Sequence, residues 1–255
     1  MKIHFLRHAT FVLTIKDHTI LVDPMLSPAQ TMDPIANAGN DRRIPMVDLP
    51  LAEAELLQLL QEIDAVLVTH THRDHWDAYA QEILPKHLPI LCQPEDQASI
   101  KKAGFSQVLP VTEQLVWQGL QISRTGGQHG TGDLRKKMGP VSGFVFKADG
   151  SRSLYIAGDS VWCEDVEQAL AQFAPEVVVL NTGAATFATG AGPITMSDAD
   201  VCRVCRTVPE AQVVAVHMET VNHCRLSRVA LRTSVEAEDL VQQVLNPDDG
   251  EVLSF

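Results

Sequence analysis

The chain has 255 residues, of which 45% are hydrophobic and 20% are charged, and its formal net charge is −12. No stretch approaches the roughly 18 uninterrupted apolar residues of a membrane span, and no run of lysine and arginine is long enough to hold a phosphate backbone. The composition predicts a protein with no membrane span and no nucleic acid partner. It leaves a small-molecule substrate open, because metal ions in a cleft outweigh distant surface charge.

The N-terminal segment MKIHFLRHAT carries charged side chains that interrupt any secretory apolar core. The five cysteines are an odd number and are spread thinly along the chain, which does not indicate a disulfide framework. Both observations predict a cytoplasmic location. Cys202 and Cys205 have the spacing of a metal or redox pair, but they stand alone in a helical pattern, and we interpret them as structural.

The first third of the chain predicts two β-rich runs, residues 4–15 (HFLRHATFVLTI) and 18–24 (HTILVDP), joined by a turn at Lys16 and Asp17. Residues 24–50 then carry five prolines and no periodicity. Such a long irregular loop predicts a lid or a pocket wall. A helix over 51–63 and a short, nearly unbroken apolar strand over 64–70 follow.

The remainder continues the alternation of strand and helix. Further strands are predicted at 88–93, in a β-rich middle from 114 to 159, and at 176–182 and 211–219; further helices are predicted at 94–105, 163–173, 197–208 and about Arg225 to Leu245. No linker separates folding units. The pattern therefore predicts one α/β domain over residues 1–255, built from two similar halves.

The stretch VLVTHTHRDHWD, residues 66–77, places His70, His72, Asp74 and His75 directly after a predicted buried strand. Imidazole is the commonest protein ligand for metals, and mixed nitrogen and oxygen donors suit zinc and related ions. The alternative is an exposed polar loop in which histidines crowd by chance. With only ten histidines in the chain, the spacing favours a metal site at the edge of a sheet.

Four donors within six residues cannot enclose a metal, so we expect further ligands at the ends of other strands. The candidates are His129, Asp159 and His217, each of which follows a predicted strand. Any one of them alone is explained better as a structural residue. Together with the first cluster they predict a site of seven ligands.

This set closely resembles the signature of the metallo-β-lactamase superfamily, a His-x-His-x-Asp-His cluster followed by a His, an Asp and a His in that order. The opening RHATFVLTI and HTILVDP is similar to the ascorbate-6-phosphate lactonase-like branch, although Arg7 stands where that branch usually has glycine. The resemblance implies an αββα four-layer sandwich with the metal site at one edge of its two sheets. It also implies a ligand set: His70, His72 and His129 for one metal, Asp74, His75 and His217 for a second, and Asp159 as the bridge.

Two divalent ions, zinc first with manganese or iron as alternatives, would lower the pKa of a shared water and supply a metal-bridging hydroxide. Asp74 is the candidate to orient this nucleophile and carry its proton. His223 could donate a proton or hold an anionic group alongside Arg225. Asp23 could fix the tautomer of a ligand histidine, or it could cap the loop before Pro24. His8 could contact a metal ligand or the substrate, or it could be an ordinary strand residue.

Three function classes follow. The first is a metal-dependent hydrolase of a small ester, lactone or amide. The alternative is a phosphodiesterase acting on a small or lipid phosphodiester. A non-catalytic metal-binding descendant would be expected to have lost ligands, whereas all seven are present here. The irregular segments 24–50 and 184–197 are expected to form the pocket walls, and a homo-oligomer is compatible with the sequence.

Overall fold

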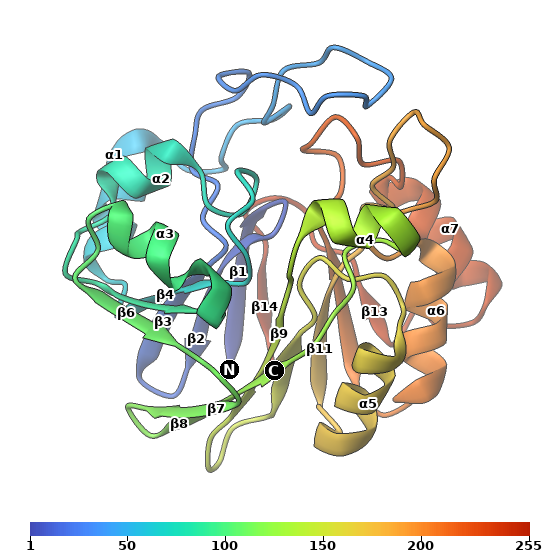
Figure 1. Ribbon diagram of the computed structural model, residues 1–255. Helices are drawn as coiled ribbons and strands as arrows, with labels where there is room; N and C mark the ends of the chain where they lie inside the picture. The colour runs from blue at the N-terminus through green and yellow to red at the C-terminus, as the bar shows by residue number, and fades with distance from the viewer.

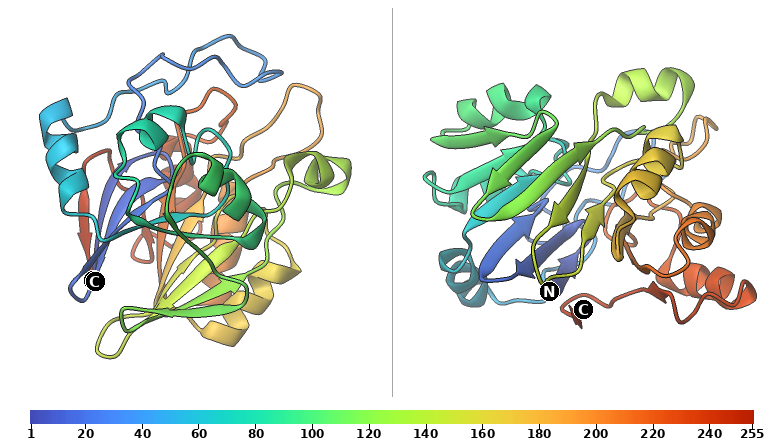
Figure 2. Two further views of the ribbon diagram at one scale, coloured as in Figure 1. Left: turned by 60° about the vertical axis from the view of Figure 1, so that its left-hand side comes forward. Right: turned by 90° about the horizontal axis from the view of Figure 1, so that it is seen from below.

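Two β-sheets pack against each other between two outer layers of helices (Figure 1). The computed structural model describes residues 1–255. The first sheet has the order β14-β1-β2-β3-β4-β5-β6 and the second the order β13-β12-β11-β10-β9-β8-β7. Both further views in Figure 2 keep the helices outside the sheets, so the predicted αββα four-layer sandwich is confirmed.

Each sheet has seven strands. Those of the first are β1 (Lys2–Arg7), β2 (Thr10–Ile15), β3 (His18–Val22), β4 (Ala65–Val68), β5 (Pro89–Cys92), β6 (Gln107–Pro110) and β14 (Val252–Ser254). Those of the second are β7 (Gln114–Trp117), β8 (Leu120–Thr125), β9 (Gly143–Lys147), β10 (Leu154–Ile156), β11 (Val177–Asn181), β12 (Gln212–Val216) and β13 (Val244–Leu245). Strand β14 pairs with β1, so the two chain ends lie close together (Figure 1).

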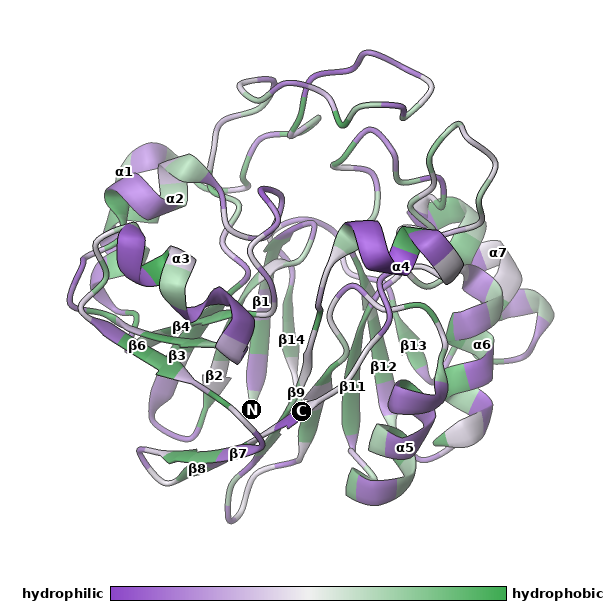
Figure 3. Cartoon of the chain, viewed as in Figure 1, coloured by the Kyte–Doolittle hydropathy of each residue, from purple (hydrophilic) through white to green (hydrophobic).

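The helices are α1 (Glu53–Gln61), α2 (Ala78–Ile83), the 3₁₀ turn η1 (Pro94–Asp96), α3 (Gln97–Lys102), α4 (Gly132–Met138), α5 (Glu164–Phe173), α6 (Asp198–Thr207) and α7 (Arg228–Ala237). Helices α1 to α3 cover the first sheet and α5 to α7 cover the second (Figure 1). A core of 22 buried residues fills the space between the sheets, and Figure 3 shows the apolar colour along the strands. No helix is both long and apolar enough to cross a bilayer.

The strand order brings several strand ends to one edge of the sandwich. Strands β3 to β6 run parallel in the first sheet, and β10 to β13 run parallel in the second. Strand β4 is buried along its whole length, as a strand covered on both faces must be. Because the carboxyl ends of parallel strands meet at the same edge, the residues after β4, β10 and β12 lie near one another.

Some predicted elements differ from the structure. The run over 4–15 is not one strand: the chain reverses at His8, which has a φ of 56°, and β1 and β2 pair as a hairpin. The terminal helix is also shorter than predicted, because it ends at Ala237 and Asp239 takes a φ of 55° that a helix cannot contain. Val244–Leu245 then adds an edge strand beside β12.

The 24–50 loop has no helix or strand apart from one bridge between Met32 and Ile44. It arches over the sheet edge where the parallel strands end, as the long blue segment at the top of Figure 1. Arg7 holds both ends of the loop. Its fully buried guanidinium donates hydrogen bonds to the carbonyls of Met25, Ser27 and Val47.

We predict that Arg7→Met destabilises the protein by about 3 kcal/mol or more, because each buried carbonyl left without a donor costs about 1–3 kcal/mol. Urea denaturation measures the change. Arg43→Met is the matched control, since the Arg43 guanidinium also donates to carbonyls of this loop but is exposed. A loss at Arg7 no larger than the loss at Arg43 would contradict this role for the buried arginine.

Candidate metal centre

The structure brings all seven predicted ligands together at the sheet edge. Three groups each have donor atoms within 4.8 Å of one another: His70, His72 and His129; His8, Asp74, His75 and His217; and His70, His75 and Asp159. The first cluster lies in the loop between β4 and α2, and the more distant residues follow β8, β10 and β12. All seven side chains except His72 are buried.

Asp159 lies between the first two of these groups. Its Oδ2 is 3.5 Å from His129 Nε2 and 3.2 Å from His75 Nε2, whereas its Oδ1 is 3.2 Å from His217 Nε2. Asn181 at the end of β11 donates to the same carboxylate at 2.7 Å. The carboxylate therefore faces both groups, which is the geometry that a bridging ligand requires.

Each candidate histidine ligand has one ring nitrogen held by a neighbour outside the cluster. The contacts are His70 Nδ1 with Thr69 Oγ1 (3.2 Å), His72 Nε2 with Met138 O (3.0 Å), His75 Nδ1 with Asp23 Oδ2 (2.8 Å), His129 Nδ1 with Ile194 O (2.8 Å) and His217 Nδ1 with Cys224 Sγ (3.7 Å). Metal-bound histidines are generally held in this way. The other nitrogen of each ring is then left for the interior of the cluster.

Two observations indicate that a cation fits among these side chains. His70 Nε2 is buried and has no hydrogen-bond partner. The Nε2 atoms of His75 and His217 face each other at 3.3 Å. Because Nδ1 of each ring contacts an acceptor, two neutral rings would present two lone pairs to each other, an arrangement that a positive charge between them would stabilise.

The Asp159 carboxylate controls the protonation of its neighbours. Burial lowers the pKa of His70 well below its usual value and that of His129 to about 4. Burial also acts to lower the pKa of His75 and His217, but the negative charge of Asp159 outweighs it, raising the pKa of His75 well above normal and that of His217 to about 10. Without metal, the carboxylate therefore favours a proton on the pair formed by His75 and His217, whose Nε2 atoms lie 3.3 Å apart.

We predict that Zn²⁺ binding to the metal-free protein at neutral pH releases protons, because ligand imidazoles must be neutral. Calorimetry in two buffers with different ionisation enthalpies measures the number released. Since protons compete with the metal, the apparent affinity should fall as the pH is lowered. An affinity that does not change between mildly acidic and mildly alkaline pH, with no proton release, would contradict this electrostatic assignment.

Asp23 lies directly behind His75. One carboxylate oxygen accepts from His75 Nδ1 and from the Thr69 hydroxyl, and the other accepts from the Thr69 backbone N–H at 2.7 Å. Since the Thr69 hydroxyl proton goes to Asp23, its oxygen accepts from His70 Nδ1. Of the two roles considered for Asp23, the geometry favours fixing the tautomer of His75, and it reaches His70 through Thr69 as well.

His8 contacts Asp74 rather than the open part of the site. Burial lowers the pKa of His8 to about 3, so the ring is neutral and its Nε2–H donates to Asp74 Oδ2 at 3.3 Å. The ring also packs on His217, with centroids 3.6 Å apart. This places His8 behind the candidate ligands, with one nitrogen directed at Asp74.

A cavity of about 230 Å³ opens onto the cluster. Its lining residues come from widely separated segments of the chain: Ile35, His72, Arg73, Asp74, His129, Met138, Asp159, Phe187 and His223. Both irregular segments expected to form walls contribute, through Ile35 and Phe187. Arg225 does not line this cavity, and its guanidinium donates to the carbonyl of Ala38 in the 24–50 loop.

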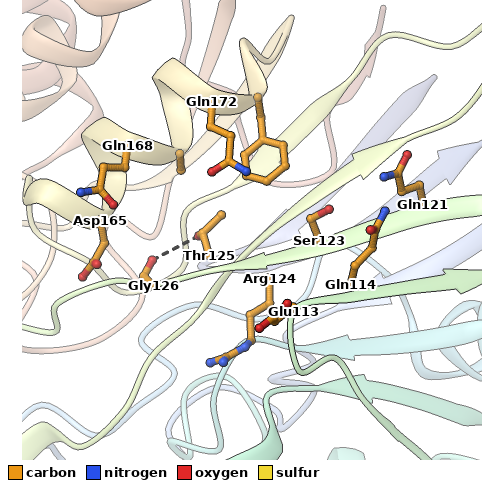
Figure 4. A pocket seen from close by; sticks show the side chains of 12 residues that line it. Glu113, Gln114, Gln121, Ser123, Arg124, Thr125, Gly126, Asp165, Gln168 and Gln172 are labelled. Carbon is orange, nitrogen blue, oxygen red and sulfur yellow. Dashed lines mark hydrogen bonds between the residues drawn. The ribbon is translucent and has the colours of Figure 1, made fainter.

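A larger cavity of about 460 Å³ lies between α5 and the strands β7 and β8 (Figure 4). Its walls are mainly amide and charged side chains, among them Gln114, Arg124, Asp165 and Gln172. None of the seven predicted ligands lines it. The candidate centre is therefore the smaller cavity, where the titratable side chains converge.

Comparison with known proteins shows which family the chain resembles. The family described as the beta-lactamase superfamily domain matches residues 18–218. Protein YddR of Bacillus subtilis (strain 168) is 35% identical over 258 residues, covering 100% of both chains. A structure of a possible metal-dependent hydrolase from Veillonella parvula DSM 2008 superposes with a TM-score of 0.96 at 38% identity. A structure of isothiocyanate hydrolase from Delia radicum gut bacteria superposes with a TM-score of 0.94, also at 38% identity. Each alignment covers 100% of this chain and 99% of the other chain.

Proposed function

Because this chain belongs to the beta-lactamase superfamily and is a metal-dependent hydrolase, we propose that it uses two divalent ions to hydrolyse a small neutral electrophile. The proposed ligands are His70, His72 and His129 for one ion and Asp74, His75 and His217 for the other, with Asp159 between them. The observation that carries the proposal is the convergence of these seven side chains, each imidazole with its outward nitrogen already held. Zinc is the first candidate, and manganese or iron suits the same donors.

When bound, a pair of divalent ions supplies an activated water and polarises the substrate. In the protein itself, Asp74 is the proposed proton carrier. Burial acts to raise the pKa of Asp74, but the hydrogen bond from His8 and the charge of His75 hold it well below its usual value. The ionised carboxylate lines the cavity, where it can accept a hydrogen bond from an attacking water and pass the proton to the leaving group.

His223 is the proposed second proton-handling group. It lines the cavity, and its ring lies 5.8 Å from that of Phe187. Its Nδ1 is buried without a hydrogen-bond partner. An imidazole in this position could donate a proton to a departing nitrogen, oxygen or sulfur atom.

The walls of the cavity favour a neutral substrate with an apolar substituent. Ile35, Met138 and Phe187 supply apolar surface. The one arginine in the lining, Arg73, directs its guanidinium to the carbonyls of Asp33 and Pro34. Its Nη2 is thus engaged with the 24–50 loop, which disfavours the phosphodiester alternative.

The substrate class proposed here is an ester, lactone or amide, and we add the isothiocyanate group because a structure 38% identical to this chain is described as an isothiocyanate hydrolase. All of these groups present a neutral electrophilic carbon to water. Within the class, the small cavity favours a substrate whose substituent is no larger than one aromatic ring. The cytoplasmic location and a homo-oligomeric state stay predictions.

The test is a panel of phenyl acetate, a γ-lactone, an anilide, benzyl isothiocyanate and bis(p-nitrophenyl) phosphate, assayed with each metal restored. We expect at least one neutral substrate to be hydrolysed with a kcat/KM well above that of the phosphodiester. Asp74→Asn, which retains an oxygen donor, should lower that kcat/KM by about 100-fold or more.

Phe187→Ala is a matched probe of the walls, and it should lower turnover of benzyl isothiocyanate more than that of methyl isothiocyanate. Hydrolysis of the phosphodiester alone would contradict the neutral-substrate proposal.

A further inference from the structure

His217 differs from the other candidate ligands in the partner of its outward nitrogen. The rings of His70, His72, His75 and His129 each contact an oxygen atom there. His217 Nδ1 instead contacts a sulfur atom, Cys224 Sγ, at 3.7 Å. Sulfur accepts hydrogen bonds at longer distances than oxygen and more weakly. Cys224 drew no attention in the sequence because it belongs to no ligand pattern.

The backbone is arranged so that this sulfur and this ring can meet. A Cβ atom at Gly183 would lie 2.7 Å from Cys224 Sγ and 2.9 Å from His217 Nδ1, so any larger residue would occupy the space of the contact. The carbonyl of Gly183 also accepts from the backbone N–H groups of Arg225 and Leu226 at 2.8 and 3.0 Å. These bonds fix the segment carrying Cys224 against the residues that follow β11.

We propose that Cys224 is a positioning residue whose sulfur accepts a hydrogen bond from His217 Nδ1–H and thereby selects the tautomer with a bare Nε2. That nitrogen lies 3.2 Å from Asp159 Oδ1 and 3.3 Å from His75 Nε2, inside the proposed metal centre. The opposite tautomer would direct an N–H toward the cation. The proposal rests on the proposed function, because Cys224 acts on His217, a proposed ligand of the second of the two ions.

The geometry separates this role from that of a ligand. The sulfur contacts Nδ1, whereas the other candidate donors surround Nε2. None of the groups of donor atoms that lie within 4.8 Å of one another contains Cys224. The sulfur therefore acts through the imidazole and does not touch the ion.

The test compares Cys224→Ala and Cys224→Ser with the unaltered protein by chelator competition, which measures the affinity for each of two Zn²⁺ equivalents. Cys224→Ala should weaken one of the two equivalents by about 10- to 100-fold and leave the other unchanged. Cys224→Ser should restore part of that affinity, because its hydroxyl oxygen can also accept a hydrogen bond. The matched control is Cys202→Ala, a cysteine buried in α6, which should change neither affinity.

Unchanged affinities in both Cys224 variants would overturn the proposal, as would an equal loss in Ala and Ser. The absorption spectrum of the Co²⁺-loaded protein gives a second readout: an intense thiolate-to-cobalt band that disappears in Cys224→Ser would make Cys224 a ligand and would also overturn it. An unaltered protein that binds neither Zn²⁺ nor Co²⁺ would contradict the metal centre itself. Two tight equivalents with an unaffected Cys224→Ala would contradict the role of Cys224 alone.

Discussion

The buried carboxylate of Asp159 is the constraint on which the site depends. A buried charge costs several kcal/mol unless it is paired and hydrogen-bonded. Here it is surrounded by His75, His129 and His217 and accepts a hydrogen bond from Asn181. The partners come from segments after β4, β8 and β12 and from β11 itself. The carboxylate thus requires both sheets to present their strand ends at one place.

A second constraint is the shell of hydrogen-bond partners that hold the outward nitrogens of the ligand imidazoles. Asp23 holds His75 and, through Thr69, His70, while main-chain carbonyls of Met138 and Ile194 hold His72 and His129. This shell fixes which nitrogen each ring directs inward. It also links the cluster to the walls, because Met138 lines the cavity with Ile35 and Phe187.

Three arginines near the site donate hydrogen bonds to main-chain carbonyls of the 24–50 loop. Arg7 is buried beneath it, Arg73 donates to its Asp33 and Pro34 carbonyls, and Arg225 donates to its Ala38 carbonyl. A long loop gains order from such bonds, because apart from one bridge its backbone forms no regular ladder of hydrogen bonds. The arginine that replaces the glycine of the lactonase-like branch has a structural task here, and Arg225 contacts the loop rather than lining the cavity.

The α/β alternation and the convergence of the ligand residues could be predicted from the sequence, because apolar strands ending in His or Asp carry a local signal. The four-layer arrangement was implied only by the resemblance to the metallo-β-lactamase superfamily. The position of the turn at His8 could not be predicted, since the residues on both sides of it are equally β-forming. The sequence also does not reveal that Met138 and Ile194 contact ligand histidines, because they act through main-chain carbonyls, which every residue has. Cys224 was missed for a related reason: its contact depends on the space left at Gly183, a distant position in the chain.

The most direct test of the two-metal centre is anomalous diffraction at the zinc absorption edge from crystals of the protein loaded with Zn²⁺. We predict two peaks, one among His70, His72 and His129 and the other among Asp74, His75 and His217, with the Asp159 carboxylate between them. Crystals that show no peak at this cluster, or a zinc ion bound only elsewhere on the protein, would contradict it.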